Sequence, residues 1–217
     1  NGQVYGGELN LSWSFSREMF SEATVQRLAD AYAQELKQLI EHCCLSSHQG
    51  VTPSDFPLAA LTQAQLDGFE LAGVEDVYPL SPMQQGMLFH ALYEPQAGDY
   101  VNQMRVDVEG LDVPRFRDAW QAALDNHDIL RTGFIWHGGL EHPLQVVHRH
   151  VQLPFIETEC PEGPGQQQML DRLADAQRVQ GFNLENPPLV RIALAHTGPQ
   201  RCPLIYTSHH ILMDGWS

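Results

Sequence analysis

The stretch TSHHILMDGWS, Thr207 to Ser217, contains two adjacent histidines, an aspartate four residues after the second histidine, and a glycine. It directly follows the apolar run CPLIY at residues 202–206, which predicts a buried strand. A strand that ends in a tight loop places an imidazole at the edge of a sheet. Histidine titrates near neutrality, so an imidazole in that place can accept a proton from an amine or a hydroxyl.

The histidine pair, His209 and His210, has two simpler interpretations. Both rings could be core side chains bonded to the backbone, or both could bind a metal ion. A zinc site needs a third ligand at a recognisable spacing, and no such set is formed by His42, His48, His142, His148 and His150. We therefore expect no metal site, and the acid–base interpretation fits best. Gly215 supports it, because glycine lets the backbone turn or approach closely where a side chain would block.

The composition restricts the classes of binding partner and the cellular location that are expected for the chain. Lysine and arginine number 12 against 27 aspartates and glutamates, and the net charge of −15 argues against nucleic acid, whose phosphates would repel it. The sequence contains no apolar run of membrane length, so no membrane association is expected. The 4 cysteines show no CxxC spacing and are interpreted as reduced thiols, which favours a cytoplasmic location.

The first 75 residues predict a small body and a linker. LNLSWSF at residues 9–15 alternates in polarity and predicts a strand. Ser21 then caps a predicted helix that continues through residue 43, with an apolar stripe from Val25 to Ile40. Residues 46–75 are rich in Pro, Ser, Gly and Asp, and they predict a linker with one short helix near residues 63–69.

The second body, residues 76–217, mixes strands with covering helices. Helices are predicted to start at Pro82 and to cover residues 113–127 and 165–182. The predicted strands cover residues 102–110, 131–137, 144–155, 188–196 and 202–210. Strands interleaved with helices on this scale predict an α/β or α+β layered sandwich.

Four stretches of the second body resemble the motifs of condensation domains from nonribosomal peptide synthetases. They are LSPMQQGMLFH (80–90), NHDILRTGF (126–134), GFNLENPPLVRIAL (181–194) and SHHILMDGWS (208–217), and they follow in the order of the family. The last of them carries the HHxxxDG pattern of the family's active site. One departure is Asn126, where the family often has arginine.

The resemblance implies a fold like that of chloramphenicol acetyltransferase, with two similar α/β lobes and the active site in the tunnel between them. It implies that the amine of a carrier-bound L-aminoacyl acceptor attacks a carrier-bound donor thioester and forms a peptide bond. His210 is then the catalytic residue, either as a general base or as a group that positions the amine and stabilises charge. His209 and Asp214 are expected to be structural, and Gly215 to lie beside the reacting centre. Arg131 is one candidate partner for Asp214, and an arginine of the second lobe is the other.

The same resemblance implies that the domain binds no cofactor of its own, because its substrates arrive on the phosphopantetheine arms of carrier domains. The expected partners are the upstream and downstream carrier (thiolation) domains, with the adenylation and epimerization domains of the same synthetase.

Residues 1–45 resemble the end of an upstream epimerization or condensation-type domain. The chain is therefore expected to be a fragment with three parts: this tail, the linker 46–75, and an incomplete first lobe at 76–217. The tail and the motif at 80–90 together imply a D-configured donor. The alternatives are an epimerization domain, which shares HHxxxDG, and a catalytically inert fragment or docking module.

Overall fold

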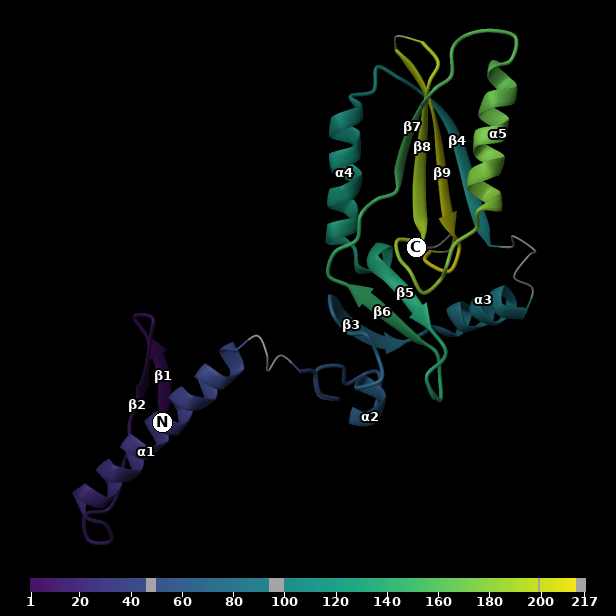
Figure 1. Ribbon diagram of the computed structural model, residues 1–217. Helices are drawn as coiled ribbons and strands as arrows, with labels where there is room; N and C mark the ends of the chain where they lie inside the picture. The colour runs from purple at the N-terminus through teal and green to yellow at the C-terminus, as the bar shows by residue number, and fades with distance from the viewer. Residues whose placement is uncertain (46–49, 94–99, 199, 214–217) are drawn as a thin grey trace. The chain divides into compact units, whose positions relative to one another are not determined.

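The structure, a computed structural model, describes residues 1–45, 50–93, 100–198 and 200–213 (Figure 1). The chain divides into two compact units, Asn1–Val51 and Thr52–Ser217. The second unit holds the helices and sheets of the predicted lobe.

The first unit begins with a β-hairpin. Strands β1 (Gly2–Tyr5) and β2 (Glu8–Leu11) pair antiparallel around Gly6 and Gly7, whose positive φ values suit a two-residue turn. The strand predicted over residues 9–15 is too long, because β1 offers only four partner residues and the pairing stops at Leu11.

One long helix completes the first unit. The helix α1 (Glu22–Cys44) begins where the hydroxyl of Ser21 accepts a hydrogen bond from the Thr24 amide, which confirms the predicted helix and its cap. None of its residues is buried, and large apolar side chains of its stripe remain exposed: Leu28, Tyr32, Leu39 and Ile40. The first unit therefore has an apolar face that it does not cover itself.

The second unit opens with a segment that lies in the predicted linker range. The helix α2 (Gln63–Leu66) is the predicted short helix, and it begins with a capping box in which Thr62 and Gln65 exchange hydrogen bonds. Phe56 and Leu66 are buried. This segment therefore contributes to the core of the second unit.

A three-stranded antiparallel sheet forms the lower part of the second unit in Figure 1, with the order β3-β6-β5. Its strands are β3 (Val74–Pro79), β5 (Thr132–Ile135) and β6 (Leu144–His148). The helix α3 (Pro82–Tyr93) begins at Pro82, as predicted, and buries Met87 and Leu88. A short 3₁₀ helix, η2 (Asp128–Arg131), leads into β5.

A four-stranded sheet forms the upper part, with the order β4-β9-β8-β7. Its strands are β4 (Val101–Glu109), β7 (Phe155–Glu159), β8 (Val190–His196) and β9 (Arg201–His209). All neighbours are antiparallel except β7 and β8, which are parallel.

The single strand predicted over residues 144–155 is wrong, because β6 and β7 belong to different sheets. Its apolar alternation continues through Val151 and Leu153 because these side chains pack into the core while outside either strand.

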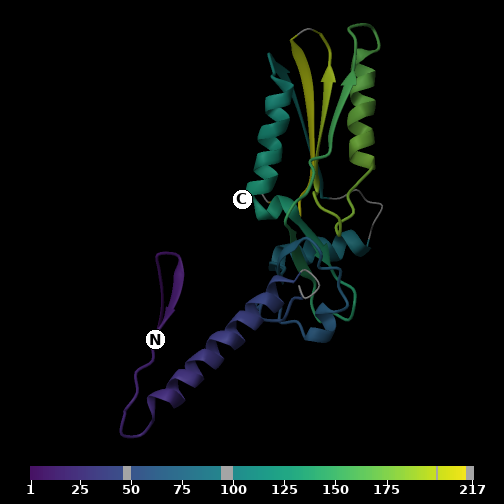
Figure 2. The same ribbon diagram turned by 60° about the vertical axis from the view of Figure 1, so that its left-hand side comes forward.

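Two helices cover opposite faces of the larger sheet. Successive residues of a strand point to opposite faces. On β8, Ile192 therefore packs with side chains of α4 (Val113–Asn126), whereas Ala193 packs with α5 (Gln166–Val179). Figures 1 and 2 show α4 and α5 on either side of the strands.

A shared core joins the two sheets. Its buried members include Leu88 of α3, Leu124 of α4, Phe134 of β5, Val190 of β8 and Ile211 of the loop after β9. Burying this many large apolar side chains together is the main source of stability for such a lobe. In the described ranges, none of the helices combines the length and the apolar character needed to cross a membrane.

At Gly133 the backbone of β5 lies against the backbone of the segment that leads into β8. A Cβ atom at Gly133 in β5 would stand 2.7 Å from the carbonyl oxygen of Glu185 and 3.0 Å from Cδ of Pro187. The next residue, Phe134, donates its amide hydrogen to the carbonyl of Leu184 at 2.8 Å. The glycine of the motif at 126–134 therefore allows β5 to contact the segment that leads into β8.

Candidate active site

The two histidines of the HHxxxDG motif lie where β9 ends. His209 is the last residue of β9 and pairs with Val101 of β4. Its amide donates to the carbonyl of Leu189 at 3.0 Å, and the amide of His210 donates to the carbonyl of Tyr100 at 2.6 Å. Backbone hydrogen bonds from both sides therefore fix the positions of the two residues, which lie at the end of β9, an inner strand of the sheet between β4 and β8.

His209 is buried, with 5% of its surface exposed. Its ring is near those of Tyr100 and Phe182, with centroids 6.4 Å and 6.3 Å away, and its Nδ1 accepts a hydrogen bond from the Ile211 amide at 3.2 Å. Burial, and secondarily the charge of His210, lower the pKa of His209 to about 4. This imidazole is therefore neutral near pH 7 and is a poor base there.

His210 is half-buried, and its ring is held from the neighbouring strand. Its Nδ1 lies 3.1 Å from the side-chain nitrogen Nδ2 of Asn102 in β4. The contact leaves Nε2 on the opposite side of the ring. The imidazole of His210 is thus oriented by the sheet, while its other nitrogen faces away from that contact.

The loop after the histidines is held by a buried amide network. The Nε2 of Gln84 in α3 donates to the carbonyl of Ile211 at 3.3 Å and to Oε1 of Gln145 in β6 at 3.0 Å. Gln145 in turn donates to the carbonyl of Pro79, and the Oε1 of Gln84 accepts from the amide of Ser81. The motif at 80–90 therefore contacts the histidine loop directly through its first glutamine.

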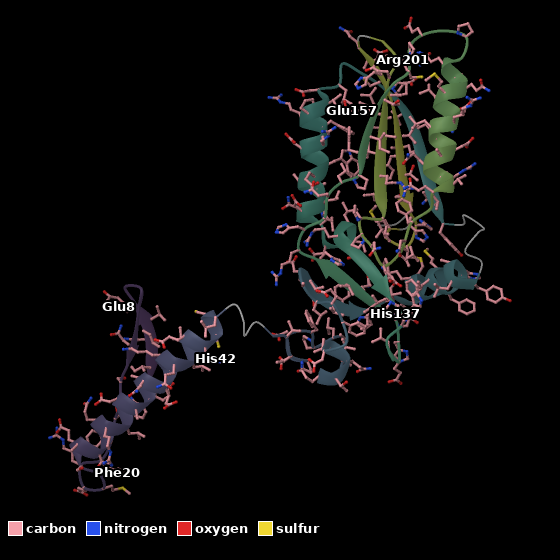
Figure 3. The ribbon with its side chains drawn as sticks, in the orientation of Figure 1. Glu8, Phe20, His42, His137, Glu157 and Arg201 are labelled. Atoms are coloured by element: carbon pink, nitrogen blue, oxygen red, sulfur yellow. The ribbon has the colours of Figure 1, made fainter. Side chains whose placement is uncertain are left out.

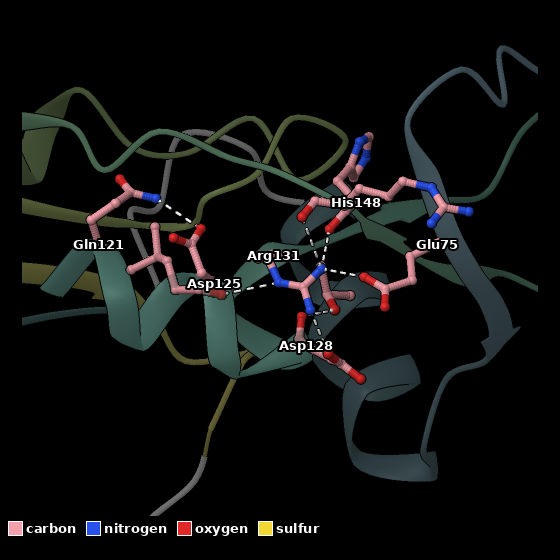
Figure 4. Close-up of polar contacts among 9 residues, drawn as sticks. Glu75, Gln121, Asp125, Asp128, Arg131 and His148 are labelled. Atoms are coloured by element: carbon pink, nitrogen blue, oxygen red, sulfur yellow. Dashed lines mark hydrogen bonds and ion pairs between the residues drawn. The ribbon is translucent and has the colours of Figure 1, made fainter. Parts of the chain in front are cut away.

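Arg131 is the centre of a separate polar cluster (Figure 4). Its side chain is 5% exposed, and its guanidinium pairs with Glu75 of β3 and Asp128 of η2, each at 2.6 Å. It also donates to the carbonyls of Leu124 and His148. Its hydrogen bond lowers the pKa of the Glu75 carboxyl. Arg131 therefore connects β3, the end of α4, η2 and the end of β6.

The predicted residues Asp214 and Gly215 lie outside the described residues, so a pairing of Asp214 with Arg131 stays a prediction. What the structure does describe is a guanidinium already bound by two carboxylates and by backbone carbonyls. The motif at 126–134 indicated the importance of Arg131 but not these partners, since Glu75 is 56 residues away in the chain.

The opposite end of the larger sheet carries paired charges. Figure 3 labels Glu157 and Arg201 there, and they form ion pairs with Arg117 and Asp107 respectively. Cys202 lies nearby but is buried among apolar side chains. In the part of the chain that the structure describes, there is no group of three or more His, Cys, Asp or Glu side chains arranged to hold a metal ion.

Two residues at the site were not predicted from the sequence. Asn102 carries no motif signal, because its role depends on the pairing of β4 with β9. Gln84 belongs to the recognised motif at 80–90, but nothing in the sequence indicates that it reaches Ile211. Both contacts join residues more than a hundred positions apart.

Residues 74–217 match the protein family described as "Condensation domain". The chain belongs to this family. The match begins at Val74, which is also the first residue of β3.

Curated relatives of this condensation domain are peptide synthases. The chain is 38% identical over 221 residues to one component of the linear gramicidin synthase of Brevibacillus parabrevis, covering 100% of this chain and 3% of that protein. It is 42% identical over 219 residues to another component of the same synthase, covering 97% of this chain and 4% of that protein. A component of the mycosubtilin synthase of Bacillus subtilis is 34% identical over 226 residues, covering 100% and 8%. The chain thus spans only a small part of each relative.

Solved condensation domains share the fold. The starter condensation domain of rhizomide synthetase superposes with a TM-score of 0.58 at 23% identity, covering 65% of this chain and 36% of that one. The first condensation domain of the calcium-dependent antibiotic synthetase gives a TM-score of 0.58 at 18% identity, covering 64% and 34%. The predicted layered α/β architecture, as part of a condensation-domain fold, is confirmed.

Proposed function

We propose that residues 74–217 form the first lobe of a condensation domain that makes a peptide bond between two carrier-bound substrates. The acceptor amine attacks the carbonyl carbon of the donor thioester. A C–N bond forms, the C–S bond breaks, and the proton lost by the amine ends on the departing carrier thiol. The observation that carries the proposal is the half-buried imidazole of His210, fixed at the end of β9 by Tyr100 and Asn102.

The two histidines have different roles in this proposal. His210 contacts the reacting groups, because its ring has one nitrogen held by Asn102 and the other directed away from that contact. His209 is structural, since it is buried, neutral near pH 7 and bonded to the Ile211 amide. Its role is to support the loop that follows.

We assign Asp214 a structural role and place Gly215 beside the reacting centre, as the family motif implies. A carboxylate away from water needs a cationic partner, because an unpaired buried charge costs several kcal/mol. The carboxylates and carbonyls already bound to Arg131 favour an arginine of the second lobe as that partner.

A second lobe is part of the proposal. On β4, Met104 and Val106 lie on the same face as Asn102, because residues two apart on a strand share a face. They are 51% and 40% exposed. Apolar side chains beside a catalytic histidine are typical of a surface that another part of the protein covers.

The partners proposed are the upstream and downstream carrier domains, which bring both substrates on phosphopantetheine arms. The domain needs no cofactor of its own. Adenylation and epimerization domains of the same synthetase would select the amino acids and set the stereochemistry of the donor.

Residues 1–45 are proposed to be the end of an upstream epimerization or condensation-type domain. The curated relatives align with the whole chain, including residues 1–73, which precede the family match. Such a domain order supports a donor that ends in a D-residue.

The test uses the complete synthetase with both carriers loaded. His210→Ala is expected to lower the rate of dipeptide formation by about a hundred- to ten-thousand-fold. His142→Ala serves as the control, because His142 is an exposed surface histidine. Near-normal condensation by a folded His210→Ala protein would overturn the proposal. A protein that instead racemises its donor without forming a peptide bond would favour the epimerization alternative.

A further inference from the structure

The side-chain amide of Asn102 determines which nitrogen of His210 can accept a proton. The amide nitrogen Nδ2 lies 3.1 Å from Nδ1 of the ring. An amide nitrogen can only donate a hydrogen bond, so the Nδ1 that receives it carries a lone pair. A neutral imidazole then holds its single hydrogen on Nε2.

The pairing of strands β4 and β9 places Asn102 next to His210. Asn102 pairs with Ser208, and paired residues of antiparallel strands project to the same face. His210 is two residues beyond Ser208, and its amide bonds to the carbonyl of Tyr100 at 2.6 Å. Both partners are therefore fixed by the pairing of β4 with β9, which makes Asn102 a part of the site geometry.

We propose that Asn102 is a positioning residue that holds His210 in the tautomer with hydrogen on Nε2. This inference rests on the proposed function and selects between the two roles open to His210. An Nε2–H group donates to the oxygen that becomes negatively charged when the amine attacks the thioester. Because Nε2 already carries a hydrogen, it cannot accept the proton of the amine. His210 therefore stabilises charge and does not act as the general base.

The tautomer of His209 is fixed in the same way, by a different hydrogen-bond donor. The backbone amide of Ile211 donates to its Nδ1 at 3.2 Å, which also leaves the hydrogen on Nε2. The two adjacent rings thus receive a hydrogen bond at the same atom, one from the backbone and one from the Asn102 side chain.

One variant separates a role in fixing the tautomer from a role in merely holding the ring. Asn102→Asp has nearly the same shape, but its carboxylate only accepts, so it holds the hydrogen on Nδ1 and leaves a lone pair on Nε2. The matched control is Asn10→Asp, which makes the same change on an exposed asparagine of the first unit.

Nitrogen-15 NMR of the histidine-labelled 217-residue chain reads the tautomer directly. The samples are solid, because associated and monomeric chains then give comparable spectra. The signals of His210 are assigned by their absence from the spectrum of His210→Gln. Near pH 8 we expect a protonated Nε2 and a lone-pair Nδ1 in the wild type and in Asn10→Asp, with the two reversed in Asn102→Asp. A wild-type ring with hydrogen on Nδ1 overturns the inference, even if His210→Ala abolishes condensation.

Condensation by the complete synthetase gives the second test. We expect kcat of Asn102→Asp to fall by about a hundredfold, the usual cost of losing one donor to a developing oxyanion, with KM for the donor carrier little changed. If His210 were a general base, the same substitution would leave the rate unchanged or raise it, because a carboxylate at Nδ1 strengthens an imidazole as a base. A rate for Asn102→Asp equal to or above that of the wild type therefore overturns the charge-stabilising role. An active His210→Ala would instead overturn the proposed function, whichever tautomer is observed.

Discussion

The side-chain amide of Gln84 donates a hydrogen bond to the carbonyl of Ile211, 127 residues later in the chain, with a nitrogen–oxygen distance of 3.3 Å. The same amide donates to Gln145, and all three residues are buried. A buried polar group that loses its partner is costly, because solvent does not replace the bond there. The start of α3 therefore holds the loop that directly follows His210.

Gln84→Leu is expected to lower the free energy of unfolding by about 1–3 kcal/mol, because it leaves the Ile211 carbonyl and the side-chain oxygen Oε1 of Gln145 without their donor. Urea unfolding measures this loss, and faster amide hydrogen exchange at Leu212 would locate it in the histidine loop. Gln85→Leu is the matched control, since Gln85 donates instead to the carbonyl of Leu80. Equal effects of the two substitutions would contradict a specific role for Gln84.

The lowered pKa of His209 predicts a pH dependence of stability. Its pKa is about 4 in the folded chain, against an ordinary value of 6.5 for histidine. Between these values the unfolded chain binds the extra proton, so stability falls as the pH drops from about 6.5 to about 4. The shift corresponds to at most about 3 kcal/mol. His209→Leu should flatten this part of the curve of unfolding free energy against pH, and an unchanged slope would contradict the assignment.

Arg131 is expected to be essential for stability. Arg131→Met keeps the apolar stem but leaves the buried carbonyls of Leu124 and His148 without their donor, which we expect to cost about 2–4 kcal/mol. Arg115→Met is the control, because Arg115 forms an exposed pair with Asp112 that contributes about 0–1 kcal/mol. Thermal unfolding of the two variants compares them. A loss for Arg131→Met no greater than for Arg115→Met would show that the cluster is not needed.

The elements with strong local signals were predictable from the sequence. The helix over residues 113–127 is found as α4, and the apolar strand before the histidines is found as β9. The strand β3 was missed, because its residues 74–79 lie where a polar linker gives way to the second body. Met83 shows the limit of periodicity: it lies four residues before the buried Met87, a spacing that places both on one side of α3, but it is 46% exposed. Contacts such as Asn102 with His210 depend on strand pairing, which no local pattern encodes.

The uncovered apolar face of the first unit predicts association. Leu28 and Leu39 of α1 are 57% and 59% exposed, and Val4 of β1 is 75% exposed. Exposed strand edges beside large apolar side chains favour contacts between chains. We expect the 217-residue chain to elute from size-exclusion chromatography as associated species, to be marginally stable, and to form no dipeptide between loaded carriers. A monodisperse monomer with condensation activity would contradict the fragment interpretation.

The stereochemistry of the donor is a separate expectation. The proposed upstream epimerization domain and the motif at 80–90 both predict a donor ending in a D-residue and an L-configured acceptor. Matched D- and L-donor thioesters offered to the complete synthetase, with the same acceptor, measure the preference as a ratio of kcat/KM. A ratio in favour of the L-donor would reject this expectation and leave the peptide-bond-forming role intact.

The contact at Gly133 limits how this sequence can vary during evolution. Any Cβ at position 133 would collide with the Glu185 carbonyl, which belongs to the segment that leads into β8. The same segment continues to Leu189, whose carbonyl holds the His209 amide. A single replacement of the glycine would therefore displace the backbone that supports the histidines. Homologues that carry another residue at this position are expected to differ also at residues 185–187, as correlated changes.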